Sequence, residues 1–260
     1  MELEIKESKD DVLRFILSDT NPSFANSIRR VIVQGVKVMA VDEVEIAAND
    51  SVMSDEILAH RLGQMPLSTP DGYLSPSECD CREGRCANCS VTLSFNGEGP
   101  GMIRAGDLES SDPDVFPVQE ETPIVRLDDD QVLSFEAIAR LGYGRDHSNW
   151  QSAIASYKYM PVLDIDQDAR DDWSPCVDAC PQEILKEEDG KLEVTDIEKC
   201  TICGACSEVC PESIEVSGDS STFIFKVEST GSLKPQEAVR KSLEVLGGKC
   251  EEFVEKLEMI

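Results

Sequence analysis

The hydrophobic and polar positions at the start of the chain predict two extended segments around one helix. Residues 13–17 form a short apolar run typical of a strand, and residues 36–46 are extended again. Between them Asn21 precedes a proline, the order expected where a helix begins. The apolar side chains that follow recur at helical spacing and are Phe24, Ile28, Val31 and Ile32. Gly35 is placed to end this helix.

Farther along, the pattern predicts short strands and then a terminal helix. Residues 91–95 and 222–228 are predicted strands, Gly231 marks a turn, and Pro235 lies near the start of the helix. The apolar positions of this helix step by four and three, forming a heptad-like seam of Val239, Leu243, Leu246, Cys250, Phe253 and Leu257. An ordinary core-facing helix would show the same seam. The Gly247-Gly248 pair disfavours a long free coiled coil, but the seam could still pack against a partner helix.

The charge balance narrows the classes of function. The 260 residues include 52 acidic and 24 basic side chains, a formal net charge of −28. Such a surface repels phosphate backbones, so we expect no direct binding of nucleic acid. The first ten residues are charged, and no segment is apolar enough to span a bilayer, so we expect no signal peptide and no membrane association. In the cytoplasm, where we therefore place the chain, eleven cysteines imply metal before disulfides.

One run of cysteines has the spacing of a bacterial ferredoxin. Cys200, Cys203, Cys206 and Cys210 spell C-x2-C-x2-C-x3-C and are followed by proline, which predicts an iron–sulfur site. A second, degenerate half-motif precedes it and ends in Cys180 and a proline. Counting back from Cys180 by the same spacing gives Cys176, Trp173 and Arg170.

In two-cluster ferredoxins the cysteine before proline serves the other cluster. Cys180 therefore completes the site of Cys200, Cys203 and Cys206, and we expect one [4Fe–4S] cluster there, or [3Fe–4S] if one ligand is not engaged. The reciprocal site would consist of Arg170, Trp173, Cys176 and Cys210, and it lacks two thiolates. Cys176 and Cys210 would then remain close together as free thiols or an oxidisable pair.

Zinc on the same cysteines is the alternative, although zinc prefers two C-x2-C units. A structural role for the cluster is favoured over an electron relay.

A second cysteine group lies earlier in the chain. Cys79, Cys81, Cys86 and Cys89 follow the pattern C-x-C-x4-C-x2-C, with Gly84 available for a tight turn. Four thiols in this spacing suit a closed, structural zinc site. The alternative is a set of unligated surface thiols.

Catalytic motifs are missing from the sequence. The two histidines are His60 and His147, and a lone histidine beside Asp146 is more often structural than a base. The sequence has no nucleophile elbow, phosphate-binding loop or zinc-protease motif. We therefore expect no active site on this chain and favour a binding or assembly role.

Several segments resemble the alpha-like subunits of RNA polymerase. The helix motif at residues 21–30, the segment at residues 60–67 that reads R-L-G-x-x-P-L, and the run at residues 144–150 are similar to segments of that family, in the same order. The loop of Cys79–Cys89 resembles the zinc loop of the eukaryotic third-largest subunit. The inserted ferredoxin-like block is similar to that of the archaeal members of the family.

This resemblance implies an α+β fold with three parts. A discontinuous dimerisation domain would comprise residues 1–46 and 218–260, an inserted mixed domain residues 47–165, and a ferredoxin-like iron–sulfur domain residues 166–217. It also implies a heterodimer with the small alpha-like subunit L, which would nucleate assembly of the large catalytic subunits. The chain would be a non-catalytic subunit of a nucleotidyltransferase, with Arg29 and Arg30 contacting a large subunit or neighbouring acids. The competing hypothesis is a ferredoxin-like electron-transfer protein on a larger scaffold.

Overall fold

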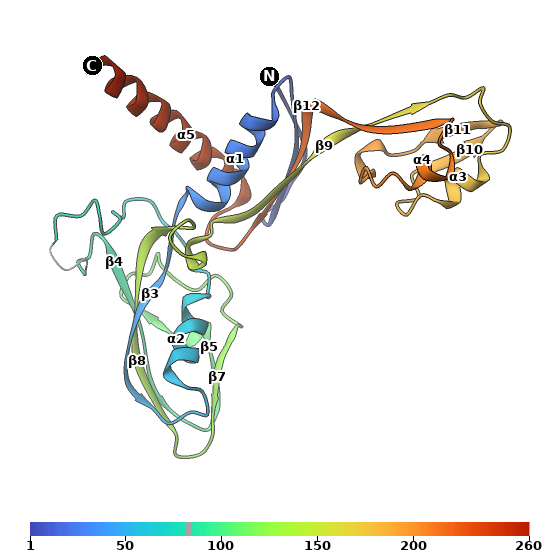
Figure 1. Ribbon diagram of the computed structural model, residues 1–260. Helices are drawn as coiled ribbons and strands as arrows, with labels where there is room; N and C mark the ends of the chain where they lie inside the picture. The colour runs from blue at the N-terminus through green and yellow to red at the C-terminus, as the bar shows by residue number, and fades with distance from the viewer. Residues whose placement is uncertain (82–84, 260) are drawn as a thin grey trace. The chain divides into compact units, whose positions relative to one another are not determined.

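The computed structural model describes residues 1–81 and 85–259, and these divide into two compact units (Figure 1). One unit comprises residues 1–7, 14–26 and 156–226, and the other comprises residues 8–13, 27–155 and 227–260. Mixed helices and strands make the fold α+β, as predicted. The three domains expected from the resemblance stay a prediction. Gly84 lies outside the described residues.

The main sheet of the first unit has four strands. Its order is β1 (Glu2–Ser8), β2 (Val12–Ser18), β12 (Ile214–Ser229) and β9 (Ala153–Ile165). The strands predicted at residues 13–17 and 222–228 are therefore confirmed. Aromatic rings fix the packing on this sheet, where the rings of Phe15 and Phe225 stack with their centroids 4.8 Å apart.

A small lobe occupies the far ends of β9 and β12 (Figure 1). It contains α3 (Ser174–Asp178), the hairpin of β10 (Leu185–Glu188) and β11 (Lys191–Val194), a 3-10 turn η3 (Ile197–Lys199), and α4 (Ala205–Val209). These elements are short, so they bury few side chains of their own. The lobe's core is made of four of its cysteines together with Trp173, Ile184, Leu185, Leu192 and Ile214.

Helix α1 (Pro22–Gln34) begins and ends as predicted. The side-chain oxygen of Asn21 accepts a hydrogen bond from the backbone N–H of Phe24 at 3.0 Å, which is the contact of an N-cap. The helix ends at Gln34, directly before Gly35. A side chain at Gly35 would collide with Val31, because its Cβ would lie 2.8 Å from a Val31 methyl.

The second unit is built on the long strands β3 (Lys37–Asn49) and β8 (Val132–Tyr143). They pair antiparallel in a sheet of order β3-β8-β4-β6, with β4 at Ser90–Glu98 and β6 at Glu109–Ser110. Helix α2 (Asp55–Gly63) packs against β3 and against β7 (Pro123–Leu127), which pairs with β5 (Gly101–Arg104) (Figure 1). Two 3-10 turns, η1 (Ala105–Asp107) and η2 (Ser148–Trp150), complete this part. Apolar side chains such as Leu58, Leu93 and Phe135 fill its core.

The terminal helix α5 (Pro235–Glu258) also belongs to the second unit. Its buried residues are Pro235, Ala238 and Ser242, all in its first turns. Beyond them the predicted seam is largely exposed, because Leu243 is 45%, Phe253 64% and Leu257 54% accessible. In this chain the seam is therefore not a core-facing stripe. Within the described part of the chain, no helix combines the length and apolar character needed to cross a membrane.

Candidate functional site

The four cysteines of the earlier group converge on one point. The sulfur atoms of Cys79, Cys81, Cys86 and Cys89 all lie within 4.8 Å of one another. The pairs Cys79–Cys86 and Cys81–Cys89 are 3.5 and 3.4 Å apart. Tetrahedral zinc with Zn–S bonds of about 2.3 Å places its sulfurs roughly 3.8 Å apart, so this donor set fits a structural zinc ion.

Local backbone structure positions these thiols. A turn with Ser75 holds Cys79, since the Cys79 N–H bonds to the Ser75 carbonyl at 3.1 Å, and a tighter turn links Cys86 to Cys89. Cys89 is fully buried where β4 begins. Burial, assisted by hydrogen bonds from the neighbouring thiols, raises the pKa of Cys89 to about 12. A bound cation would favour the thiolate form of Cys89, which burial disfavours.

The second candidate centre lies in the lobe, where the ferredoxin spacing predicted it. Cys180, Cys200, Cys203 and Cys206 all line one small pocket, although 26 residues separate the first cysteine from the last. We call these four residues the open half. The other walls are largely apolar and include Leu163, Ile184, Leu185 and Val216. Four thiols around an apolar hollow suit an iron–sulfur cluster.

The loop that carries three of these cysteines has an unusual backbone. Ile202 has a φ of 54° and Gly204 a φ of 77°, and a β-branched residue rarely adopts the first of these. The two turns bend the chain so that Cys200 and Cys206 face the same pocket, with Cys206 at the start of α4. Burial, followed by the nearness of Cys180 and Cys200, raises the pKa of Cys206.

The reciprocal half of the block is occupied by protein. Cys176 and Cys210 form a disulfide, and Arg170 Nη1 lies 3.0 Å from the Cys210 sulfur and 3.5 Å from the Cys176 sulfur. Trp173 is fully buried beside them in the same core cluster. We call Arg170, Trp173, Cys176 and Cys210 the filled half. The positions obtained by counting back from Cys180 are therefore brought together around one spot.

Two segments that carried the family resemblance also meet in space. Gln64 Nε2 donates to Asn149 Oδ1 at 2.5 Å, and a Cβ at Gly63 would lie 2.7 Å from Asn149 Nδ2. Arg61 donates to the carbonyl of Ile124 at 2.7 Å. His147 caps the η2 turn by accepting from the Asn149 N–H. These contacts are structural and place no group in position to attack a substrate.

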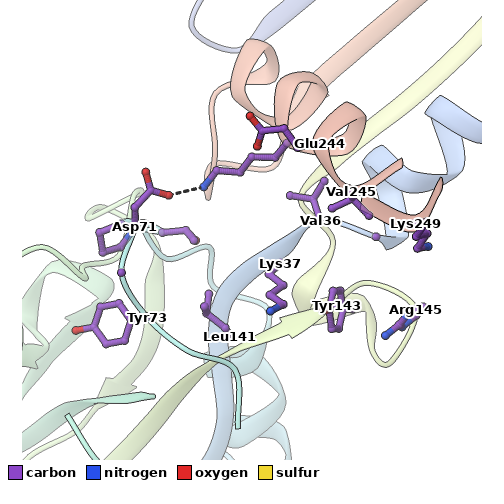
Figure 2. A pocket seen from close by; sticks show the side chains of 15 residues that line it. Val36, Lys37, Asp71, Tyr73, Leu141, Tyr143, Arg145, Glu244, Val245 and Lys249 are labelled. Carbon is purple, nitrogen blue, oxygen red and sulfur yellow. Dashed lines mark hydrogen bonds and ion pairs between the residues drawn. The ribbon is translucent and has the colours of Figure 1, made fainter. Parts of the chain in front are cut away.

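Reasoning from the sequence missed a basic groove in the second unit. The groove has a volume of about 490 Å³ and lies between α5 and the strands β3 and β8 (Figure 2). Its cations are Lys37, Arg145, Lys241 and Lys249, and its anions are Asp71 and Glu244. The guanidinium of Arg145 lies 4.3 Å from the centre of the Tyr143 ring, and Lys241 pairs with Asp71 at 2.9 Å. The lining therefore has more cations than anions, whereas the whole chain has a net charge of −28.

A second hollow continues this groove toward α1. It shares Gly35, Arg145 and Lys249 with the first and adds Arg30 and Leu246. Arg30, singled out by the resemblance, therefore borders the basic groove. The signal in the sequence was weak because these cations come from segments more than 200 residues apart.

The chain is similar to known subunits of RNA polymerase. Residues 44–166 match the model of the RNA polymerase Rpb3/RpoA insert domain. The chain is 40% identical to the DNA-directed RNA polymerase subunit Rpo3 of Methanosarcina acetivorans, over 100% of this chain and 99% of the relative. It is 38% identical to the subunit of that name from Methanothermobacter thermautotrophicus, over 98% of each chain. The Thermococcus kodakarensis Rpo3 is 37% identical, over 100% and 99%.

Proposed function

We propose that this chain, which belongs to the Rpo3 family of DNA-directed RNA polymerase subunits, is an assembly subunit of the multisubunit polymerase. The relatives match from end to end, so the resemblance to alpha-like polymerase subunits found in the sequence is confirmed. The electron-transfer alternative is not favoured. As a polymerase subunit the chain would work in the cytoplasm and carry no catalytic centre of its own.

The exposed seam of α5 is the observation that supports a heterodimer. Leu243, Phe253 and Leu257 expose apolar surface along a helix that buries only its first turns. Exposed apolar stripes of this kind mark protein interfaces, and a heptad seam suits a partner helix. The small alpha-like subunit L would supply that helix, and the pair would then recruit the large catalytic subunits.

Co-expression with the small subunit tests the heterodimer. The double variant Leu243→Glu/Phe253→Glu should weaken the pair by more than about tenfold, since two charges would be buried without partners. Glu255→Lys, on the opposite side of α5, is the matched control and should leave the pair intact. Size-exclusion chromatography and titration calorimetry measure the result, and an unchanged affinity in the double variant would refute this use of the seam.

The basic groove would receive an acidic segment of a large subunit. The cations of the groove are complementary to an acidic segment. Arg30 lines the adjoining hollow. Arg29 and Arg30, which the resemblance led us to expect at a contact with a large subunit, both lie on α1. In a reconstituted polymerase, Arg145→Glu/Lys249→Glu should block recruitment of the large subunits and leave the heterodimer intact. Recruitment at the wild-type level would exclude this surface.

The two cysteine centres would stabilise parts of the chain that lack large cores. Cys79, Cys81, Cys86 and Cys89 would hold one zinc ion and close the loop before β4. The open half would hold one [4Fe–4S] cluster, or [3Fe–4S] if one thiol stays free, and cross-link the lobe as a structural metal does. Metal analysis of anaerobically purified protein tests both assignments. Zinc without iron and sulfide in the lobe would refute the cluster.

A further inference from the structure

A lysine on the β1-β2-β12-β9 sheet bonds to the backbone of the loop that leads to Cys200. Lys158 lies on β9, and its Nζ donates to the carbonyl of Glu198 at 2.5 Å and to the carbonyl of Cys200 at 2.8 Å. Cys200 is one of the four thiols of the open half. One ammonium group on the sheet therefore bonds directly to the backbone of a residue that we propose as a cluster ligand.

The ammonium group is partly withdrawn from water. Lys158 is half-buried, and the charged residues Arg14, Asp196 and Glu198 line the same hollow of the sheet face. Withdrawing an ammonium group from water is unfavourable unless it is hydrogen-bonded, so the two carbonyls stabilise the Lys158 side chain in this position. A charge-assisted hydrogen bond is also about twice as strong as a neutral one.

A second lysine reaches the same segment from the opposite edge of the sheet. Lys6 on β1 pairs with the Glu198 carboxylate at 2.8 Å. A hollow of about 610 Å³ on this sheet face is lined by residues of all four strands and by Asp196, Glu198 and Lys199. The segment before Cys200 thus lies across the sheet and is held from both edge strands.

We propose that Lys158 is a positioning residue that ties the Cys200 loop to the β1-β2-β12-β9 sheet and so couples occupancy of the cluster site to the order of that sheet. This inference rests on the iron–sulfur cluster of the proposed function. Anchoring the Cys200 carbonyl fixes where its sulfur points and reduces the freedom that the loop must lose on binding. The nearby positive charge also favours the more reduced, more negative state of a cluster.

The full chain, reconstituted anaerobically with iron and sulfide, provides the test. Lys158→Met keeps the length of the side chain and removes all donors. It should release its cluster about tenfold faster to an iron chelator, as followed by visible absorption, since the lost hydrogen bonds are worth roughly a factor of ten. Its reduction potential should shift to a more negative value.

Lys199→Met is the matched control, because Lys199 lies on the same segment but pairs with Asp196 in an exposed position. Its release rate should equal that of the wild type, and its potential should shift less than that of Lys158→Met because the Lys199 charge is exposed and screened by solvent. Lys158→Arg, which can still donate to both carbonyls, should recover part of the slow release. A merely structural lysine would instead lower the melting temperature of the cluster-free chain and leave both cluster readouts unchanged, and that result would overturn the proposal.

Two further outcomes separate this inference from the proposed function. If the wild type takes up no iron and sulfide, the cluster assignment itself fails, and this inference fails with it. If the wild type holds a cluster and Lys158→Met holds it equally long, only the role of Lys158 is refuted. Should Lys158→Met not fold, Lys6→Met removes the second tie and should accelerate release by a smaller factor, and an unchanged rate there would equally contradict the coupling.

Discussion

The two halves of the cysteine-rich lobe share the residue spacing of one ferredoxin motif and differ in the groups at those positions. The open half presents four thiols to a pocket with largely apolar walls. In the filled half a guanidinium, an indole and a disulfide stand where the motif spacing would place four thiolates. Both halves contribute to the same core cluster. The comparison shows that a cross-link and a large side chain can form the centre of one half of a small lobe, whereas the other half presents thiols suited to a metal.

Loss of iron should be the largest effect and should follow any change in the open half. Cys206→Ala removes a buried thiol that would be a ligand of the proposed cluster, so the lobe should lose that cluster or retain a less stable one with three irons. Cys250→Ala is the control, because Cys250 is exposed on α5, outside the lobe. Iron and sulfide analysis with visible absorption measures both. Full iron content in Cys206→Ala would remove Cys206 from the ligand set.

Restoring the motif should give the filled half a cluster of its own. Arg170→Cys/Trp173→Cys recreates the spacing C-x2-C-x2-C-x3-C, and under reducing conditions iron should rise from about four to about eight atoms per chain. Arg170→Ser/Trp173→Ser empties the same space without adding thiols and should stay at about four. If the cysteine variant gains no iron, the likeness between the halves is limited to sequence spacing.

Trp173 should account for much of the stability of the filled half. Trp173→Ala should cost about 3–5 kcal/mol of unfolding free energy, because the indole is fully buried and leaves a cavity. Trp173→Phe should cost much less, since it keeps the ring and removes an indole N–H that has no hydrogen-bond partner among the described residues. Urea unfolding followed by circular dichroism distinguishes the two. Equal losses would show that packing of the six-membered ring contributes little.

The smallest effect should come from Arg170. Its guanidinium contacts the sulfurs of the disulfide, which are weak acceptors, so Arg170→Met should cost about 1 kcal/mol or less. Lys191→Met, an exposed change on the neighbouring hairpin, provides the baseline in the same urea experiment. A loss of several kcal/mol in Arg170→Met would mean that the charge, and not the indole, holds the filled half together.

Much of the local structure could be predicted from the sequence. The helix cap at Asn21, the helix end before Gly35 and the strands at residues 13–17, 91–95 and 222–228 all depend on neighbouring residues, and all are confirmed. The cysteine spacings pointed to both candidate centres: the structure brings together the sulfurs of the earlier group, and the four cysteines of the open half line one pocket. The metals at these centres stay a prediction. The resemblance to polymerase subunits rested on short motifs and was confirmed by the relatives.

The basic groove and the tie at Lys158 could not be foreseen in this way. Lys37, Arg145 and Lys249 come from three distant segments, and nothing around each one distinguishes it from any surface cation. Lys158 lies 42 residues before the carbonyl that it holds. Such groups are selected by their partners across the fold, and those partners are not visible from their own neighbourhood.

The sequence by itself therefore determined the short-range features: where helices begin and end, how the cysteines are spaced and which half of the ferredoxin motif is degenerate. Only the tertiary structure decided that Arg170, Trp173 and a disulfide fill the second half, that the α5 seam is exposed, and that Lys158 of the sheet bonds to the carbonyl of Cys200. The physical reason is range. Backbone propensities and ligand spacing act over a few residues, whereas burial and charge pairing depend on which distant segments the folded chain brings together.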